Sequence, residues 1–190
     1  QLNITENCLD RHLKDKADQV AFYWEPNDPQ QQAKTYTYAE WHAEVCRYAN
    51  ALRQLGVKKG DRVCLYLPMI PSLAIAVLAC ARIGAIHSVV FAGFSAQALA
   101  DRIQDAACSV LITSDLLYRG NKVLALLDIA QEAAEQCPSL NHVLVHQLGE
   151  DLNLSKPLYT AIDPLVAASD TWAEAEVMEA EDPLFILYTS

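Results

Sequence analysis

Residues 86–95 of the chain read IHSVVFAGFS, and the rest of the sequence is organised around them. A β-branched apolar run ends abruptly in residues 91–95 (FAGFS), where a helical pattern begins. Gly93 allows a positive φ, and Ser95 is a preferred N-cap for the helix that follows. Such a turn leaves free N–H groups at the positive end of a helix, which suits an anion. Because most turns of this kind only connect two elements, the indication of a binding site is weak by itself.

Buried strands and helices alternate on both sides of this stretch. The pattern predicts strands at 62–67, 86–91, 109–113, 143–146 and 183–190, and helices at 38–55, 72–83, 95–107 and 123–136. This alternation is typical of βαβ units in an α/β fold, with a mostly parallel sheet and helices on both faces. In such folds, ligands bind beyond the carboxyl ends of the strands.

The chain has the length of about one domain, and its 52% of hydrophobic residues can form a sizeable core. Composition divides it into an N-terminal segment with a hairpin (1–37), a βαβ core (38–147), an acidic segment (148–182) and a final strand (183–190). In the first segment we expect a short helix over 8–14, capped by Thr5 or Asn7, and a hairpin of 20–24 with 35–37. Thr37 and Glu40 form a capping box for the next helix.

Charge and cysteine usage exclude several classes of protein. Nine acidic residues and one lysine fall between 150 and 182, so this segment carries −8 of the net charge of −10. The absence of a basic patch argues against a nucleic-acid partner. Six scattered cysteines without a C-x-x-C pair indicate buried thiols in a reducing compartment, so we expect a cytoplasmic location. Prolines and glycines divide the apolar stretch at 63–94 into pieces too short to cross a membrane.

The loop expected at 114–122 contains Arg119, Gly120 and Lys122, and it follows a strand end as the turn at 91–95 does. If the two strands are neighbours in the sheet, the two loops meet and form an anion site. The sequence contains no G-x-G-x-x-G, Walker A, H-E-x-x-H or G-x-S-x-G motif. His87 is interpreted as a hydrogen-bonded core histidine. The carboxylates that remain as candidate acids or bases are Asp10, Asp115 and Glu40, of which Glu40 is already explained as a cap.

Five motifs, taken together, resemble one family. They are residues 7–12 (NCLDRH), 66–69 (YLPM), 79–85 (ACARIGA), 87–95 (HSVVFAGFS) and 181–190 (EDPLFILYTS). These closely resemble the AMP-forming acetyl-coenzyme A synthetases, which belong to the adenylate-forming acyl-CoA synthetases. The similarity covers residues 3–147 and 179–190, and the acidic segment between them matches poorly.

The resemblance implies the N-terminal part of a large AMP-binding domain. The family uses ATP and Mg²⁺ to convert acetate to an acyl-adenylate, and then transfers the acyl group to coenzyme A. Thr189 and Ser190 match the start of its phosphate loop, and its acetate contacts and catalytic lysine lie in later sequence. We therefore expect an inactive fragment with no catalytic residue and no metal ligand, whose partners are small-molecule substrates and the rest of its own polypeptide. An exposed apolar edge is expected to favour self-association.

The resemblance also implies part of a coenzyme A site. The turn residues Phe91, Ala92 and Gly93 match the family's turn against the nucleotide end of coenzyme A, although Ala92 replaces a glycine. Arg119 matches the first of two arginines that approach the phosphates of coenzyme A, and Lys122 replaces the second. Lysine keeps the charge and loses the planar fork.

Two alternatives remain open at this point. One is a related ligase for propionate or acetoacetate, and the other is a stand-alone flavodoxin-like binding module.

Overall fold

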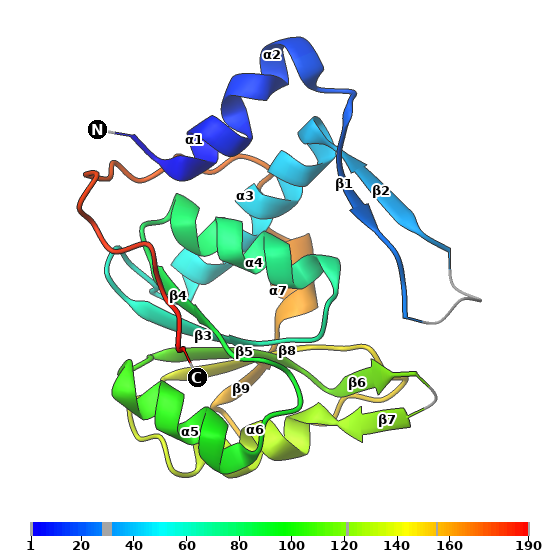
Figure 1. The fold of residues 1–190 in the computed structure, drawn as a ribbon, viewed down its shortest axis with the longest axis vertical. Helices are drawn as coiled ribbons and strands as arrows, with labels where there is room; N and C mark the ends of the chain where they lie inside the picture. The colour runs from blue at the N-terminus through cyan, green and yellow to red at the C-terminus, as the bar shows by residue number, and fades with distance from the viewer. Residues whose placement is uncertain (1, 28–31, 121, 155, 190) are drawn as a thin grey trace.

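The computed structural model describes residues 2–27, 32–120, 122–154 and 156–189 (Figure 1). Its framework is a six-stranded sheet of order β10-β4-β3-β5-β8-β9, in which every neighbouring pair is parallel. The strands are β3 (Arg62–Tyr66), β4 (Ile86–Val89), β5 (Val110–Ser114), β8 (His142–His146), β9 (Tyr159–Ala161) and β10 (Phe185–Ile186). The predicted α/β class is confirmed.

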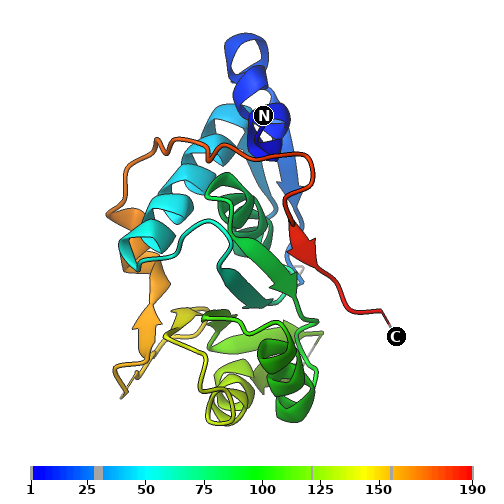
Figure 2. The same cartoon turned by 90° about the vertical axis from the view of Figure 1, so that its left-hand side faces the viewer.

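Helices cover both faces of the sheet (Figures 1 and 2). On one face lie α3 (Tyr38–Gln54), α4 (Pro71–Arg82) and α7 (Ile162–Ala167), and on the other lie α5 (Ala96–Asp105) and α6 (Leu126–Ala134). Along β3, Val63 and Leu65 pack with the first group, whereas Cys64 and Tyr66 pack with the second. Burial on both faces explains why the central strands are apolar nearly throughout. No helix in the described ranges is long and apolar enough to cross a membrane.

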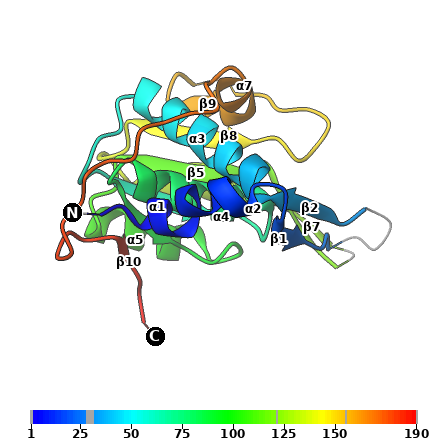
Figure 3. The ribbon, with the colours of Figure 1, turned by 90° about the horizontal axis from the view of Figure 1, so that it is seen from above.

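The N-terminal segment contains α1 (Ile4–Cys8), the 3₁₀ helix η1 (Asp10–His12) and α2 (Leu13–Lys16), followed by the antiparallel hairpin of β1 (Val20–Trp24) and β2 (Lys34–Thr37). The hairpin is as predicted. The expected single helix over 8–14 is wrong, because Asn3 caps α1 and the backbone of Leu9 leaves the helical region. Figure 3 shows α1 lying along α4 and α2 along α3.

Four further expectations need correction. The loop expected at 114–122 is a second hairpin of β6 (Leu116–Arg119) and β7 (Lys122–Ala125), so the following helix begins at residue 126. The acidic segment contributes the unpredicted strand β9 to the sheet edge. The final strand pairs over two residues only among those described. The turn at 91–95 follows β4, and the β6–β7 hairpin follows β5. These two strands are not neighbours, because β3 lies between them.

The most buried charge in the fold belongs to Arg82 at the end of α4, with 1% of the residue exposed. Its terminal nitrogens donate to the two carboxylate oxygens of Asp10, each at 2.9 Å, and its Nε donates to the carbonyl of Ala173 at 2.7 Å. Thr5 Oγ1 accepts a further bond at 3.1 Å. Together these contacts attach the N-terminal segment and the acidic segment to α4.

Burial by itself raises the pKa of the Asp10 carboxyl, but the hydrogen bond and the positive charge of Arg82 outweigh it. The pKa of Asp10 therefore lies below its ordinary value of 3.8. A carboxyl whose pKa is depressed by folding stabilises the fold above its unfolded pKa, and this contribution is lost as the pH falls through the folded pKa.

The substitution Asp10→Asn should lower the free energy of unfolding by about 3–5 kcal/mol at pH 7, because it leaves the buried guanidinium without a counter-charge. Urea denaturation of both proteins measures this loss, and Asp15→Asn, at an exposed site, is the matched control. The difference between wild type and variant should shrink as the pH falls below 3.8. A constant difference down to pH 2 would contradict the ion-pair explanation.

Candidate functional site

The turn at 91–95 is held by a side chain from the central strand. Phe94 N–H donates to the carbonyl of Phe91 at 3.1 Å, and Gly93 lies between them with a φ of 108°. The Tyr66 hydroxyl of β3 accepts from Gly93 N–H at 3.1 Å and donates to the Phe94 carbonyl at 2.7 Å. A Cβ at residue 93 would meet only the Phe91 ring at 4.0 Å, so glycine is required for its φ and not for space.

This arrangement narrows the expectation that the turn offers free amides to an anion, because two of the turn's own amides are used. The N–H groups of Gly93 and Phe94 are both used within the protein, so neither is available to a ligand. Ser95 caps α5 as predicted, and its Oγ accepts from Ala98 N–H at 3.3 Å. Ala92 does not adopt a positive φ, so alanine is accommodated in place of glycine. What the turn presents to solvent is apolar: Phe91 is 60% exposed and tilts against Phe94 at 5.8 Å.

The β6–β7 hairpin carries the two predicted cations at its tip. Arg119 and Lys122 are directly opposite each other in its register. Both are exposed, and within the described chain neither side chain makes a hydrogen bond or an ion pair. Like charges in direct cross-strand register destabilise a hairpin.

The base of this hairpin is anchored by the buried carboxylate of Asp115. Its oxygens accept from the amides of Leu116, Leu148 and Gly149 at 2.8, 2.7 and 2.9 Å. A Cβ on Gly149 would come within 3.0 Å of this carboxylate, which explains the glycine. Further along β6, the Tyr118 carbonyl accepts from Asn27 Nδ2 at 3.2 Å. The hairpin is therefore held at two points between the sheet and the N-terminal hairpin.

The turn and the hairpin lie at the same edge of the sheet, because both follow the carboxyl ends of parallel strands. With β3 between β4 and β5, their strands end two strand spacings apart, about 10 Å. No hydrogen bond, ion pair or ring contact joins residues 91–95 to Arg119 or Lys122 among the residues that the structure covers. A ligand shared by the turn and the hairpin would therefore have to bridge the strand β3 that separates them.

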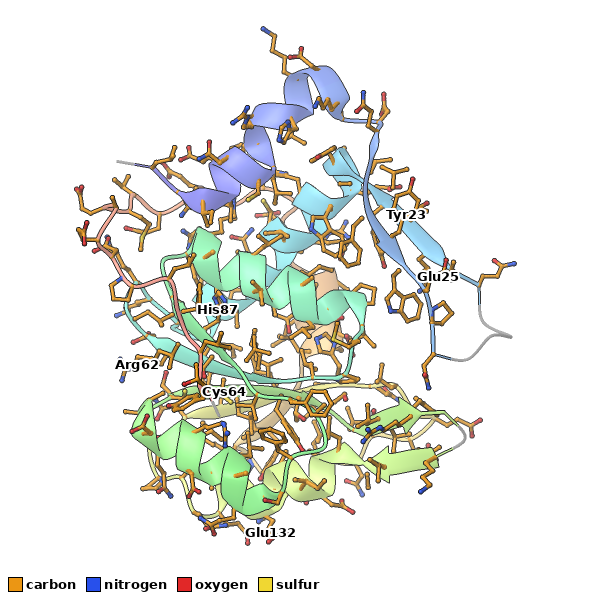
Figure 4. All side chains as sticks on the ribbon, viewed as in Figure 1. Tyr23, Glu25, Arg62, Cys64, His87 and Glu132 are labelled. Carbon is orange, nitrogen blue, oxygen red and sulfur yellow. The ribbon has the colours of Figure 1, made fainter. Side chains whose placement is uncertain are left out.

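The other candidate residues have structural roles. Asp10 pairs with Arg82, Asp115 binds three amides, and the Glu40 carboxylate accepts from Thr37 N–H at 2.8 Å as the predicted capping box requires. His87 is buried in the sheet (Figure 4), and burial lowers its pKa to about 4, so it is neutral at pH 7. Its Nδ1 has no partner in the described structure, so the expectation of a hydrogen-bonded histidine is wrong for this atom.

A separate cavity of about 230 Å³ lies between α3, α4, α7 and the end of β8. Several of its polar side chains are paired: Arg47 NH1 donates to Glu44 Oε1 at 2.9 Å, although the buried Arg47 Nε has no partner in the described structure. His146 bonds Asp163 at 2.6 Å through Nδ1 and Tyr48 at 2.9 Å through Nε2. Burial raises the pKa of Asp163, but the bond to His146 outweighs it and holds the pKa below its ordinary value. The ionised Asp163 carboxylate accepts a hydrogen bond from Nδ1–H, and in that tautomer Nε2 accepts from the Tyr48 hydroxyl.

The described residues include no group of three or more His, Cys, Asp or Glu side chains that could hold a metal ion. Five of the six cysteines are buried and Cys8 is exposed, and all are free. At the other end of the predicted site, Thr189 is exposed and Ser190 lies outside the described residues.

Comparison with known proteins identifies the family. A family model described as "AMP-binding enzyme" matches residues 9–190. The chain belongs to the AMP-binding enzyme family. It is 51% identical over its whole length to an acetyl-coenzyme A synthetase of Alkalilimnicola ehrlichii, 50% to one of Nostoc linckia and 47% to one of Bdellovibrio bacteriovorus. It spans 30%, 56% and 30% of these relatives.

In this AMP-binding enzyme chain, sequence analysis missed the residues that position the turn. Tyr66 belongs to the YLPM motif, but nothing in its neighbours along the chain shows that its hydroxyl reaches residues 27 and 28 positions later. The sequence does contain one indication, which is a tyrosine near the end of an otherwise apolar strand. A buried tyrosine hydroxyl generally has a hydrogen-bond partner.

Removing the Tyr66 hydroxyl should loosen the turn without disrupting the sheet. We expect Tyr66→Phe to cost about 1–2 kcal/mol of unfolding free energy, because two hydrogen bonds are lost while the ring remains. Hydrogen exchange at the Gly93 amide should accelerate more than exchange in β5. Tyr23→Phe, at a ring that is 71% exposed, is the control. Unchanged exchange at Gly93 would show that Tyr66 does not hold the turn.

Proposed function

We propose that residues 1–190 form the N-terminal part of the large AMP-binding domain of an acetate–CoA ligase. The ligase would convert acetate, ATP and coenzyme A to acetyl-CoA, AMP and pyrophosphate through an acetyl-adenylate. The observation that carries this proposal is the identity of about 50% to acetyl-coenzyme A synthetases along the whole chain. It favours a ligase over a stand-alone flavodoxin-like module. Propionate or acetoacetate remains the alternative acyl substrate.

The geometry of the sheet edge supports a site for the nucleotide end of coenzyme A. Arg119 and Lys122 present two unneutralised cations side by side, which suits phosphate groups. The exposed Phe91 ring offers a surface on which an adenine base can stack. Ala92 and Gly93 carry no large side chain, so a ligand can approach the turn closely. Because β3 separates the two parts, a long ligand such as coenzyme A fits better than a single phosphate.

ATP would be bound at the other part of the site, where Thr189 and Ser190 begin the proposed phosphate loop. Hydroxyl groups at this position can bond phosphate oxygens, and Mg²⁺ would be bound mainly through those phosphates. We assign no metal ligand and no catalytic residue to this chain. The fragment by itself is accordingly proposed to be inactive, and the location of the parent enzyme to be cytoplasmic.

The sheet edge at β10 is proposed to contact the rest of the polypeptide. Phe185 and Leu187 are 54% and 66% exposed there, which is unusual for large apolar side chains on a strand. The isolated 190-residue chain should therefore self-associate through this edge. Sedimentation of the chain against Phe185→Lys checks this: concentration-dependent association lost in the variant is expected, and a monomer at every concentration counts against it.

In the full-length protein, Arg119→Ala should raise the KM for coenzyme A by about 10- to 100-fold, as expected for loss of a charge-assisted bond. Acetate-dependent exchange between ATP and pyrophosphate should be retained, because it precedes coenzyme A binding. Lys122→Arg should lower the KM for coenzyme A by restoring the planar fork. If exchange fell in parallel with thioester formation in Arg119→Ala, the assignment would be wrong.

A further inference from the structure

The guanidinium of Arg102 lies between two aromatic rings that come from distant parts of the chain. Its central carbon is 4.9 Å from the centroid of Phe94 and 5.4 Å from that of Tyr188. Phe94 belongs to the turn at 91–95, and Tyr188 directly precedes Thr189. Arg102 on α5 is therefore in contact with both segments of the proposed site.

The position of the guanidinium is fixed by α5 itself. Its NH1 donates to the carbonyl of Ala98, one turn earlier, at 2.8 Å. Asp105, one turn later, accepts from the Tyr188 hydroxyl at 2.7 Å. Burial, together with this bond to Asp105, raises the pKa of Tyr188 to about 12, so the phenol keeps its proton and remains a donor at neutral pH.

The contacts of Tyr188 with Arg102 and Asp105 hold the chain that follows β10. β10 pairs with β4 over two residues, and the next residue, Leu187, is 66% exposed. In Figure 2 the chain after β10 runs away from the sheet at the level of α5. Among the described residues, Tyr188 is fastened to α5 through Arg102 and Asp105, while Phe94 is fastened to Tyr66 through its carbonyl.

We propose that Arg102 is a positioning residue that sets the turn of the coenzyme A site and the chain entering the phosphate loop in fixed relation to each other. This inference rests on the proposed function, because it concerns how two parts of that site are aligned. Arg102 itself faces the rings and the Ala98 carbonyl, so it acts on substrates through Phe94 and Tyr188. A neutral flexible side chain such as methionine in its place would fill the space between the rings and remove the cation–π attraction.

The test uses Arg102→Met in the full-length protein. Loss of two cation–π contacts should raise the KM for coenzyme A in thioester formation and the KM for ATP in pyrophosphate exchange, each roughly tenfold. The kcat and the melting temperature should change little. Arg102→Lys, which keeps a cation, should recover most of both KM values. Arg11→Met, at an exposed arginine of the N-terminal segment, is the matched control.

Single-ring variants separate the two contacts. Phe94→Leu should raise the KM for coenzyme A alone, and Tyr188→Leu should raise the KM for ATP alone. If Arg102→Met leaves both KM values unchanged, the inference is overturned. It is equally overturned if kcat and melting temperature fall together with unchanged KM values, since that pattern shows a folding role.

The proposed function can fail separately. If the unmodified full-length protein shows no acetate-dependent exchange, the ligase assignment fails whatever the variants do. Hydrogen exchange on the 190-residue chain then still tests the contact: Arg102→Met should accelerate exchange in peptides covering 91–95 and 187–189 and leave α6 unchanged. If exchange in both peptides is the same in Arg102→Met as in the unmodified chain, the contact is refuted. If the methionine variant unfolds, Arg102→Gln, which also removes the cation, provides the same comparison.

Discussion

The positive charge of Arg82 lies where water does not reach it, and the surrounding chain is arranged to satisfy it. Asp10 supplies the counter-charge, and Ala173 supplies a carbonyl. Asn3 adds bonds from its amide to the carbonyls of Ala81, Arg82 and Glu176. An unpaired buried charge is very unfavourable, so the N-terminal segment and the acidic segment both pack against α4, where they supply the partners of Arg82.

At the edge formed by the carboxyl ends of the strands, the loops are held by a few polar side chains at the strand ends. Tyr66 bonds the turn at 91–95, and Asp115 bonds the base of the β6–β7 hairpin. The hydrogen bonds of both side chains are made to groups within the protein. What remains exposed there is the Phe91 ring at the turn and the pair of cations at the hairpin tip, which are the two parts of the proposed coenzyme A site.

Much of the architecture was predictable. The alternation of apolar strands with helices, the capping box of Thr37 and Glu40, and the N-cap of Ser95 are local patterns, and each is present in the structure. The β6–β7 hairpin and β9 were missed because neither has a buried face that repeats along the chain. The burial pattern of β7 is exposed throughout, so no periodicity marks it. Its pairing with β6 decides that it is a strand.

The sequence alone determined the family and the α/β class, because motifs and periodicity depend on residues near one another in the chain. The tertiary structure decided which polar groups remain available. Asp10 and Asp115 could serve as acids or bases by residue type. Each instead has a structural role, because it bonds a partner far away in the sequence. Tyr66 and Arg102 have unremarkable neighbours, and contacts 28 and 86 residues away give them their roles. Such partners are set by strand order and helix packing, which no local pattern contains.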